Sequence, residues 1–249
     1  MYSRLLALFI CLFFLFSLNK PAYAGDVETG IKAYQERDYK TALTLLSKAA
    51  EQGNAAAQFT LGYMYEEGQG VIQNTREAFK WYKSAADQRY AKAQANLGVL
   101  YYKGRGVLPD YREAAKWYKS AADQGNAAAQ FNLGYLYDKG QGVLQDYREA
   151  VEWYKLAANQ GNAAAQFTLG VIYYEGQGVS KDYKQAAKWF ILAADQGYIE
   201  AKCDLAKMYV RGDGVGKNIS LAKRLAKEGY DAGIEFCKTV WEKYELSNQ

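Results

Sequence analysis

Two short segments near the C-terminal end have residue types and spacings that could carry chemistry. The first, Ser220-Leu221-Ala222-Lys223, matches Ser-x-x-Lys, which places a lysine amine one helical turn from a serine nucleophile in penicillin-recognising enzymes. Those enzymes also need Ser-Asp-Asn and Lys-Thr-Gly motifs, which this sequence lacks. We therefore predict no catalytic residues, and keep hydrolysis of β-lactam or cell-wall material as an alternative function.

The second segment, from Gly212 to Lys217, has the glycines and the lysine of a phosphate-binding loop. That motif needs four residues between its first glycine and Gly-Lys, followed by Ser or Thr. Arg211 stands where the first glycine should be, and Asn218 follows the lysine. The segment is better interpreted as one copy of a repeated loop.

Composition narrows the chemistry further. The 249-residue chain contains 23 tyrosines and no histidine, so catalytic pairs and metal sites that use histidine are excluded. No cysteine or carboxylate cluster has metal-ligand spacing, and we expect neither a metal nor a cofactor. The formal net charge is +4 with no long basic run, so we expect no nucleic-acid partner.

The first 24 residues have the pattern of a secretory signal peptide. Arg4 gives a positive start, an apolar run extends from Leu5 to Leu18, and the segment ends in Ala22-Tyr23-Ala24. This pattern predicts cleavage after Ala24. An uncleaved anchor is the alternative, but a membrane span needs about 20 apolar residues. We therefore expect a periplasmic or secreted protein with no stable membrane anchor after cleavage.

Beyond the signal, a 36-residue pattern repeats through the chain. Copies aligned on an Ala-Ala-x-Gln segment begin at Ala49, Ala85, Ala121, Ala157 and Ala193, and a broken sixth copy begins at Gly229. Each copy predicts two helices, A and B. A helix pair of this size cannot bury its apolar face alone, so stacking of successive pairs is expected. The fold class is therefore all-α, a right-handed α/α solenoid of antiparallel helix pairs.

The third copy shows where the helices begin and end. Asn126 is a typical N-cap and Gly140 a typical stop, which predicts helix A over 127–139. Asp146 caps helix B, and Glu149 three residues later predicts a capping box. Side chains that never vary between copies indicate packing, because stacking needs the same contact in each copy. One such set is Tyr65, Tyr101, Tyr137, Tyr173 and Tyr209.

The pattern A-x-A-Q-x-x-L-G-x-x-Y-x-x-G-x-G-V, followed by A-x-x-W-Y and A-A-x-Q-G, resembles the Sel1-like repeat family, relatives of tetratricopeptide repeats. It covers five repeats, at 49–84, 85–120, 121–156, 157–192 and 193–228. Residues 1–24 are the cleaved signal, and 25–48 resemble a tetratricopeptide-like helix pair. Residues 229–249 are expected to form a C-terminal capping helix.

The resemblance implies that a partner binds the concave face, along one stripe of the A helices. Positions in this stripe vary between copies, so packing does not dictate them, and they are aromatic with scattered charges. Aromatic anchors with a charged rim suit a peptide-binding groove, although such residues could also pack between neighbouring helices. The predicted partner-binding residues are Phe59, Tyr63, Glu66, Tyr102, Phe131, Tyr135, Asp138, Phe167 and Tyr174.

Cys203 and Cys237 remain after signal cleavage and lie 34 residues apart, two short of the repeat. They should therefore fall on adjacent A helices, where a disulfide is geometrically possible but tight. Secretion would favour pairing.

The resemblance implies a non-enzymatic, exported scaffold or adaptor that binds a protein or peptide, and we expect a monomer. Some cysteine-rich members of the family have been described as β-lactamases, which keeps the enzymatic alternative open. A binder of glycan, peptidoglycan or a host protein is the other alternative, since tyrosines could stack on sugars.

Overall fold

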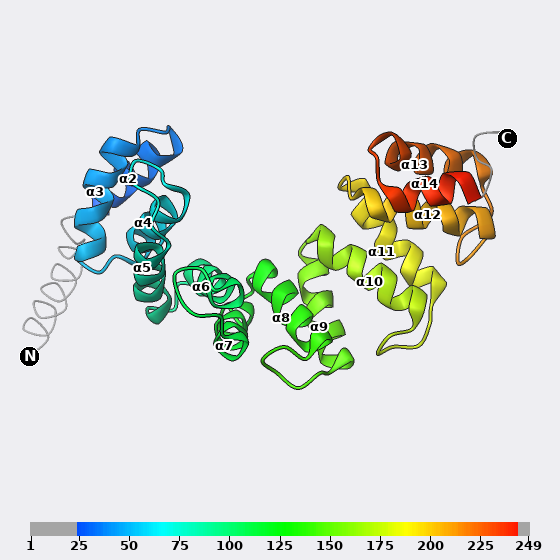
Figure 1. Cartoon of the computed structure of the whole chain (residues 1–249), viewed down its shortest axis with the longest axis horizontal. Coiled ribbons are helices and arrows are strands. Elements are labelled where there is room, and N and C mark those ends of the chain that lie inside the picture. The colour runs from blue at the N-terminus through cyan, green and yellow to red at the C-terminus, as the bar shows by residue number, and fades with distance from the viewer. Residues whose placement is uncertain (1–23, 244–249) are drawn as a thin grey trace, which may run out of the picture. The chain divides into compact units, whose positions relative to one another are not determined.

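The computed structural model describes residues 24–243, and in that part of the chain every element is a helix. The chain divides into two compact units, residues 1–109 and 110–249. The helices described in unit 1 are α2 (Ala24–Gln35), α3 (Tyr39–Glu51), α4 (Ala55–Glu67), α5 (Thr75–Asp87) and α6 (Ala91–Lys103). Consecutive helices pack against each other, as α4 and α5 do in Figure 1.

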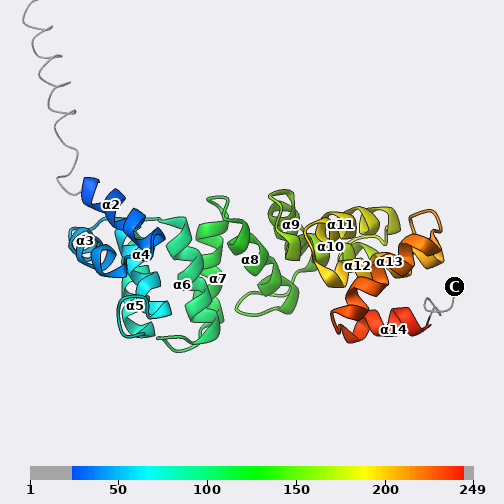
Figure 2. The same cartoon turned by 90° about the horizontal axis from the view of Figure 1, so that it is seen from above.

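Unit 2 continues the same alternation to the C-terminal side. Its helices are α7 (Tyr111–Ala122), α8 (Ala127–Lys139), α9 (Tyr147–Asn159), α10 (Ala163–Glu175), α11 (Tyr183–Asp195), α12 (Ile199–Arg211), α13 (Ile219–Asp231) and α14 (Glu235–Lys243). In Figure 2, α14 lies beside α13 at the end of this unit. The predicted fold class is confirmed, and we call α4, α6, α8, α10 and α12 the A helices and α5, α7, α9, α11 and α13 the B helices. The predicted signal lies in residues 1–24, and of these 1–23 are outside the described part.

Helix ends follow the repeated sequence closely. Asn126 accepts a hydrogen bond from the amide of Ala129 and begins α8, and Gly140 ends it in the left-handed conformation. The capping box predicted at α9 is wrong in its second half. Asp146 does cap the helix, but its own amide donates to the carbonyl of Tyr137, and Glu149 accepts from the Trp153 indole instead. The recurring tyrosine thus anchors the loop to helix A through its backbone carbonyl.

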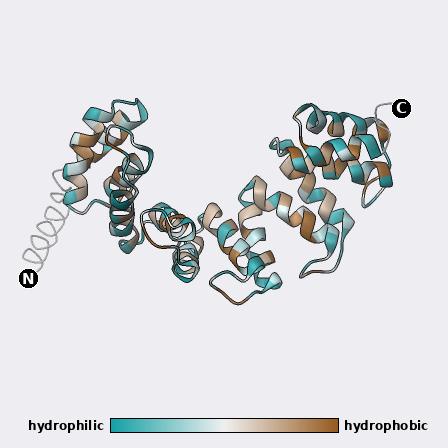
Figure 3. Cartoon of the chain, viewed as in Figure 1, coloured by the Kyte–Doolittle hydropathy of each residue, from teal (hydrophilic) through white to brown (hydrophobic). Residues whose placement is uncertain are grey.

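The core lies between the helices of each pair and alternates with polar surface along every helix (Figure 3). Gly170 of α10 faces Phe190 of α11, and a Cβ added there would lie 2.9 Å from the ring carbon Cγ. Gly134 meets Tyr154 in the same way, also at 2.9 Å. The glycine of helix A therefore makes room for the aromatic ring of helix B.

The C-terminal end of unit 2 is closed by a disulfide between Cys203 of α12 and Cys237 of α14, whose Cα atoms lie 5.2 Å apart. Both cysteines are fully buried. Gly229 lies directly beneath this bond, and a Cβ there would lie 2.7 Å from the Cβ of Cys237. Every earlier copy has alanine at the position of Gly229. The glycine and the two cysteines therefore form one matched set.

Candidate interaction surface on the A helices

The predicted stripe falls on three equivalent positions of successive A helices. The first position holds Phe59, Phe131 and Phe167, the second Tyr63 and Tyr135, and the third Glu66, Tyr102, Asp138 and Tyr174. Phe59, Tyr63, Glu66 and Tyr102 belong to unit 1, and the other predicted residues belong to unit 2.

In unit 1, Tyr63 is the most accessible of the predicted residues, with 37% of its surface exposed. Its ring lies edge-on to Tyr34 of α2, with centroids 6.3 Å apart. Phe59 instead packs against Tyr82 of α5 and Tyr90 before α6, at 5.7 and 5.4 Å. Phe59 therefore connects consecutive repeats, whereas Tyr63 is available to a partner.

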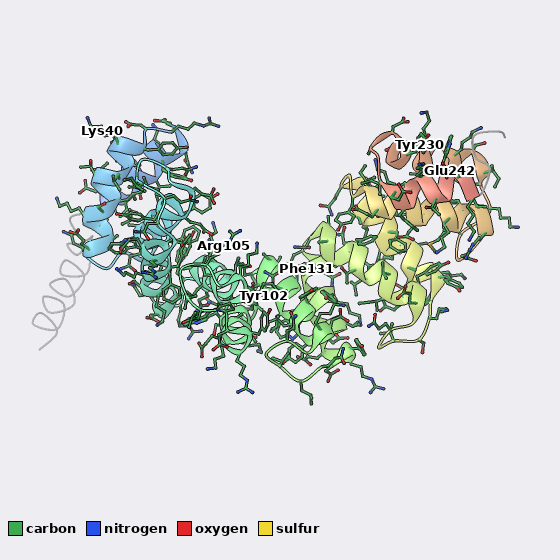
Figure 4. All side chains as sticks on the ribbon, viewed as in Figure 1. Lys40, Tyr102, Arg105, Phe131, Tyr230 and Glu242 are labelled. Atoms are coloured by element: carbon green, nitrogen blue, oxygen red, sulfur yellow. A yellow bond between two sulfur atoms is a disulfide. The ribbon has the colours of Figure 1, made fainter. Side chains whose placement is uncertain are left out.

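Glu66 is the charged member of the unit 1 stripe, and it is already engaged. Its carboxylate accepts a hydrogen bond of 2.7 Å from the Tyr82 hydroxyl and forms an ion pair with Arg105 at 3.9 Å. Burial, followed by the Glu66 charge, raises the pKa of Tyr82, so this hydroxyl stays protonated. Tyr102 is half-buried near the C-terminal end of α6, close in sequence to Arg105 (Figure 4).

In unit 2, Phe131 lies against Tyr154 with centroids 5.6 Å apart. The residue that begins the next A helix is Asn162, where the corresponding residues after Phe59 and Phe167 are tyrosines that pack on those rings. Phe131 is therefore covered by one ring fewer than Phe59 and Phe167.

Tyr135 and Asp138 lie beside Phe131 on α8, and Lys139 connects them. The Lys139 ammonium lies 5.8 Å from the centre of the Tyr135 ring and 2.7 Å from the Asp138 carboxylate. The hydrogen bond and charge of Asp138 raise the pKa of Lys139. Phe131, Tyr135, Asp138 and Lys139 thus combine aromatic surface with a paired charge on one helix.

The remaining predicted residues of unit 2 take part in packing between repeats. Phe167 stacks on Tyr198 at 4.8 Å. Tyr174 packs against Tyr183 at 5.0 Å and lies under the Lys207 ammonium at 4.6 Å. Its hydroxyl accepts a bond of 3.3 Å from Arg211. These contacts give both residues a structural role.

A buried row of glutamines was not singled out from the sequence, although the repeated Ala-x-Ala-Gln contains it. Gln58, Gln94, Gln130 and Gln166 are 4–6% exposed, and each side-chain amide donates to a carbonyl eight residues earlier. The side-chain oxygens of Gln58, Gln130 and Gln166 accept from Gln88, Gln160 and Gln196. Lys202 takes this position in the last repeat and pairs with Glu228. The row fixes the link from each B helix to the next A helix.

The segments considered first for chemistry lie at the surface. Ser220 is exposed in the first turn of α13, where Asn218, Leu221 and Arg224 line a shallow depression with it. Gly212 ends α12 in the left-handed conformation, as Gly140 ends α8, so the phosphate-loop-like segment is a repeat loop. Among residues 24–243 there is no group of three or more potential metal ligands. Over the same range, no helix has the length and hydrophobicity required to span a bilayer.

A model of the Sel1 repeat matches six consecutive segments, at 23–54, 55–90, 91–126, 127–162, 163–198 and 199–234. The chain belongs to the Sel1 repeat family. The six segments begin with a shorter one that contains α2 and α3, where the sequence had suggested a tetratricopeptide-like pair.

Two solved structures resemble this Sel1 repeat protein along most of its length. A Sel1 repeat protein from Oxalobacter formigenes is 36% identical, with a TM-score of 0.83 over 91% of this chain and 92% of that one. A protective antigen present in uropathogenic Escherichia coli strains is also 36% identical, with a TM-score of 0.82 over 86% of this chain. The chain spans 47% of that antigen's length.

A curated relative matches over a much shorter stretch. The chitin synthase regulator SKT5 of Saccharomyces cerevisiae is 46% identical over 48 residues, which are 19% of this chain and 7% of that protein. As a Sel1 repeat protein, the chain is a helical-repeat scaffold of a class that usually mediates protein–protein interactions.

Proposed function

We propose that this Sel1 repeat protein is a non-enzymatic, exported scaffold that binds a protein or peptide through its A helices. The observation that carries the proposal is the pair of tyrosines at the second stripe position. Tyr63 is exposed and Tyr135 half-exposed, and charged Glu67 and Lys139 lie four residues further along the same helices. An aromatic side chain whose polar end reaches solvent, next to a charged side chain, is a typical anchor for a bound peptide.

The disulfide supports export. Disulfides persist in oxidising compartments such as the periplasm and the extracellular space. Here the Cys203–Cys237 bond fits over Gly229, which replaces the alanine of the other copies. A chain shaped around the bond would be poorly matched to a reducing compartment. Together with the N-terminal pattern, this favours a periplasmic or secreted protein.

Site-specific photocrosslinking in the native cell tests the proposed surface. A photoreactive phenylalanine analogue replaces Tyr63 in one variant and Tyr135 in another, and the control carries it at Leu156, an exposed position on the B helix α9. We expect protein adducts from positions 63 and 135 and not from 156. Equal adducts from all three positions, or none from 63 and 135, would contradict the proposal. Adducts to glycan fragments would favour the glycan-binding alternative.

Cell fractionation tests the location separately. N-terminal sequencing of the recovered protein should start at residue 25, and the protein should be released with periplasmic or secreted proteins. A full-length protein in the cytoplasmic fraction with free thiols at Cys203 and Cys237 would refute export without affecting the proposed surface.

A further inference from the structure

The loops that join helix A to helix B expose one large aliphatic side chain each in three repeats. Ile72 is 91% exposed, Leu108 84% and Leu144 89%. The next most exposed large hydrophobic residue among those described is Leu156, at 47%. All three occupy one position of the repeat, directly after the Gly-x-Gly-Val of the loop. One exposed aliphatic residue alone would need no explanation. The same loop position is exposed in three successive repeats, however, so the feature belongs to the repeat and not to a single site.

The loops are held in place, so the exposure is built into the fold. The second loop glycine lies on the first turn of the preceding B helix: a Cβ on Gly106 would lie 2.6 Å from the carbonyl carbon of Thr75. In the loop of the next repeat, a Cβ on Gly142 would lie 2.7 Å from the Arg112 amide nitrogen. Further along that same loop, Gln145 donates to the Asp138 carbonyl at 2.8 Å and the Asp146 amide donates to Tyr137 at 3.0 Å. Leu144 lies between these fixed points and reaches no core.

Basic side chains accompany the aliphatic ones. Arg76, Arg112 and Arg148 follow four residues after Ile72, Leu108 and Leu144, and all three are exposed. Within residues 24–243 none of these guanidinium groups forms an ion pair, because nearby Glu77 and Glu113 pair with lysines and Glu149 accepts from Trp153. These guanidinium groups are therefore accessible beside the aliphatic tips, with Asp110 and Asp146 as the negative charges of the same segments.

The last two loops carry a lysine in place of the exposed aliphatic residue. Ser180 and Gly216 replace the aliphatic residue, and each is followed directly by a lysine, Lys181 or Lys217, where earlier loops have glutamine or proline. Each loop thus presents an aliphatic tip or a lysine. We call the segments 71–76, 107–112, 143–148, 179–184 and 215–220 the loop edge. The first segment lies in unit 1, the second is divided equally between the two units, and the last three lie in unit 2.

We propose that the loop edge of each unit, taken by itself, docks peripherally on an anionic phospholipid surface. Aliphatic tips would enter the boundary between headgroups and acyl chains, while arginines and lysines pair with lipid phosphates. A lipid surface needs no shape-complementary pocket, and single Ile and Leu tips separated by whole repeats offer none. Protein hot spots favour Trp, Tyr and Arg in packed pockets and are poor in Leu. The loop edge contains none of the residues predicted for the A-helix surface.

The test uses the full chain as purified from the producing cell. Every variant then has the same N-terminal processing. The loop variant combines Ile72→Gln, Leu108→Gln and Leu144→Gln. The matched control combines Leu156→Gln, Ile191→Gln and Leu192→Gln, which are exposed aliphatic residues of B helices. Neither set removes a buried side chain, and circular dichroism checks that both fold. Cosedimentation is measured with phosphatidylcholine vesicles, with and without about 30% phosphatidylglycerol.

We expect the wild type and the control to sediment with anionic vesicles, and the loop variant to bind about tenfold more weakly or worse. Amide hydrogen exchange should slow at the loop edge in the wild type when vesicles are added, which separates this contact from any made by the N-terminus. Raising the salt from about 0.1 M to about 0.5 M should weaken binding, because it screens the charges. Equal binding by the loop and control variants, or no loop protection, would overturn the proposal. Loop protection by a captured protein in place of vesicles would also overturn it.

Discussion

The last repeat of unit 2 and the repeats before it solve the same packing problem with different side chains. In α10 and α11, a glycine faces a phenylalanine ring, Gly170 against Phe190. In α12 and α13, the equivalent residues are Ala206 and Ala226, both fully buried. The methyl group that would collide with a ring is tolerated once the ring is gone. These two positions are therefore coupled within one repeat.

Loss of the aromatic ring is accompanied by other changes in the last repeat. Its buried glutamine becomes Lys202, paired with Glu228, and its phenylalanine position becomes Cys203, bonded to Cys237. The last repeat therefore replaces ring packing and an amide row with an ion pair and a covalent bond. The repeat formed by α12 and α13 therefore draws its stability from different contacts than the repeats before it.

The coupling between glycine and ring gives the largest expected effect. Phe190→Ala should destabilise by about 3–5 kcal/mol, because it leaves a cavity. Gly170→Ala should cost about 1–3 kcal/mol by overpacking. In the double variant, which recreates the Ala206–Ala226 pair, the second substitution should cost nothing further. Denaturant unfolding of the four chains measures this cycle, and strictly additive losses would show that the two positions are not coupled.

The Cys203–Cys237 disulfide of the last repeat should contribute nearly as much to the free energy of unfolding as the glycine–ring pair. Cys203→Ser with Cys237→Ser should lower the free energy of unfolding by about 3–4 kcal/mol, because a loop of this size is no longer closed in the unfolded chain. Wild type treated with a reductant serves as the control and should lose a similar amount. An unchanged unfolding midpoint in both would mean that the bond does not stabilise the end of the stack.

Much of this architecture was predictable, because the repeat itself is information. Five in-register copies separate packing positions from variable ones, and the bounds predicted for helix A of the third copy, 127–139, agree with α8. The role of each variable position was harder to predict. Glu66 looks like a rim charge in sequence, yet the structure pairs it with Tyr82 of α5 and with Arg105 in the loop after α6. A single helix pattern does not show which neighbour will reach a side chain.

The loop edge was missed for a related reason. Ile72, Leu108 and Leu144 follow a conserved-looking loop and resemble ordinary buried aliphatics in sequence. Only the placement of the loop against the preceding B helix shows that they point to solvent. The 36-residue repeat and the helix-capping residues therefore predict the helices. The contacts between repeats decide which side chains remain exposed.

Asp204 should make the stability of the last repeat depend on pH in a way that the earlier repeats do not share. Earlier repeats have neutral Thr or Asn at its position, whereas burial, opposed by Lys207 and reinforced by Glu175, raises the pKa of Asp204 to about 6. Between its unfolded pKa near 4 and this value the folded chain binds more protons, so this group's contribution to stability falls as pH rises. Asp204→Asn should therefore stabilise by about 2–3 kcal/mol at pH 8 and by much less at pH 4. A gain that is the same at both pH values would contradict the shift, and Glu200→Gln, on the same helix, is the control.

Substitution in the glutamine row should have the smallest effect on stability. It tests most directly what the last repeat lost when Lys202 replaced the buried glutamine. In Gln166→Met, the side-chain volume is kept, but the carbonyl of Ala158 loses its donor at 3.1 Å and Gln196 loses its acceptor at 2.7 Å. Leaving buried polar groups unpaired should cost about 1–2 kcal/mol, measured by denaturant unfolding. Lys202→Met in the last repeat, where the row has ended, removes an ion pair that is partly solvent-exposed and should cost under about 1 kcal/mol. If Lys202→Met cost as much as Gln166→Met, the ion pair would be an equal substitute for the amide row, and the weaker link would have to be sought elsewhere in the stack.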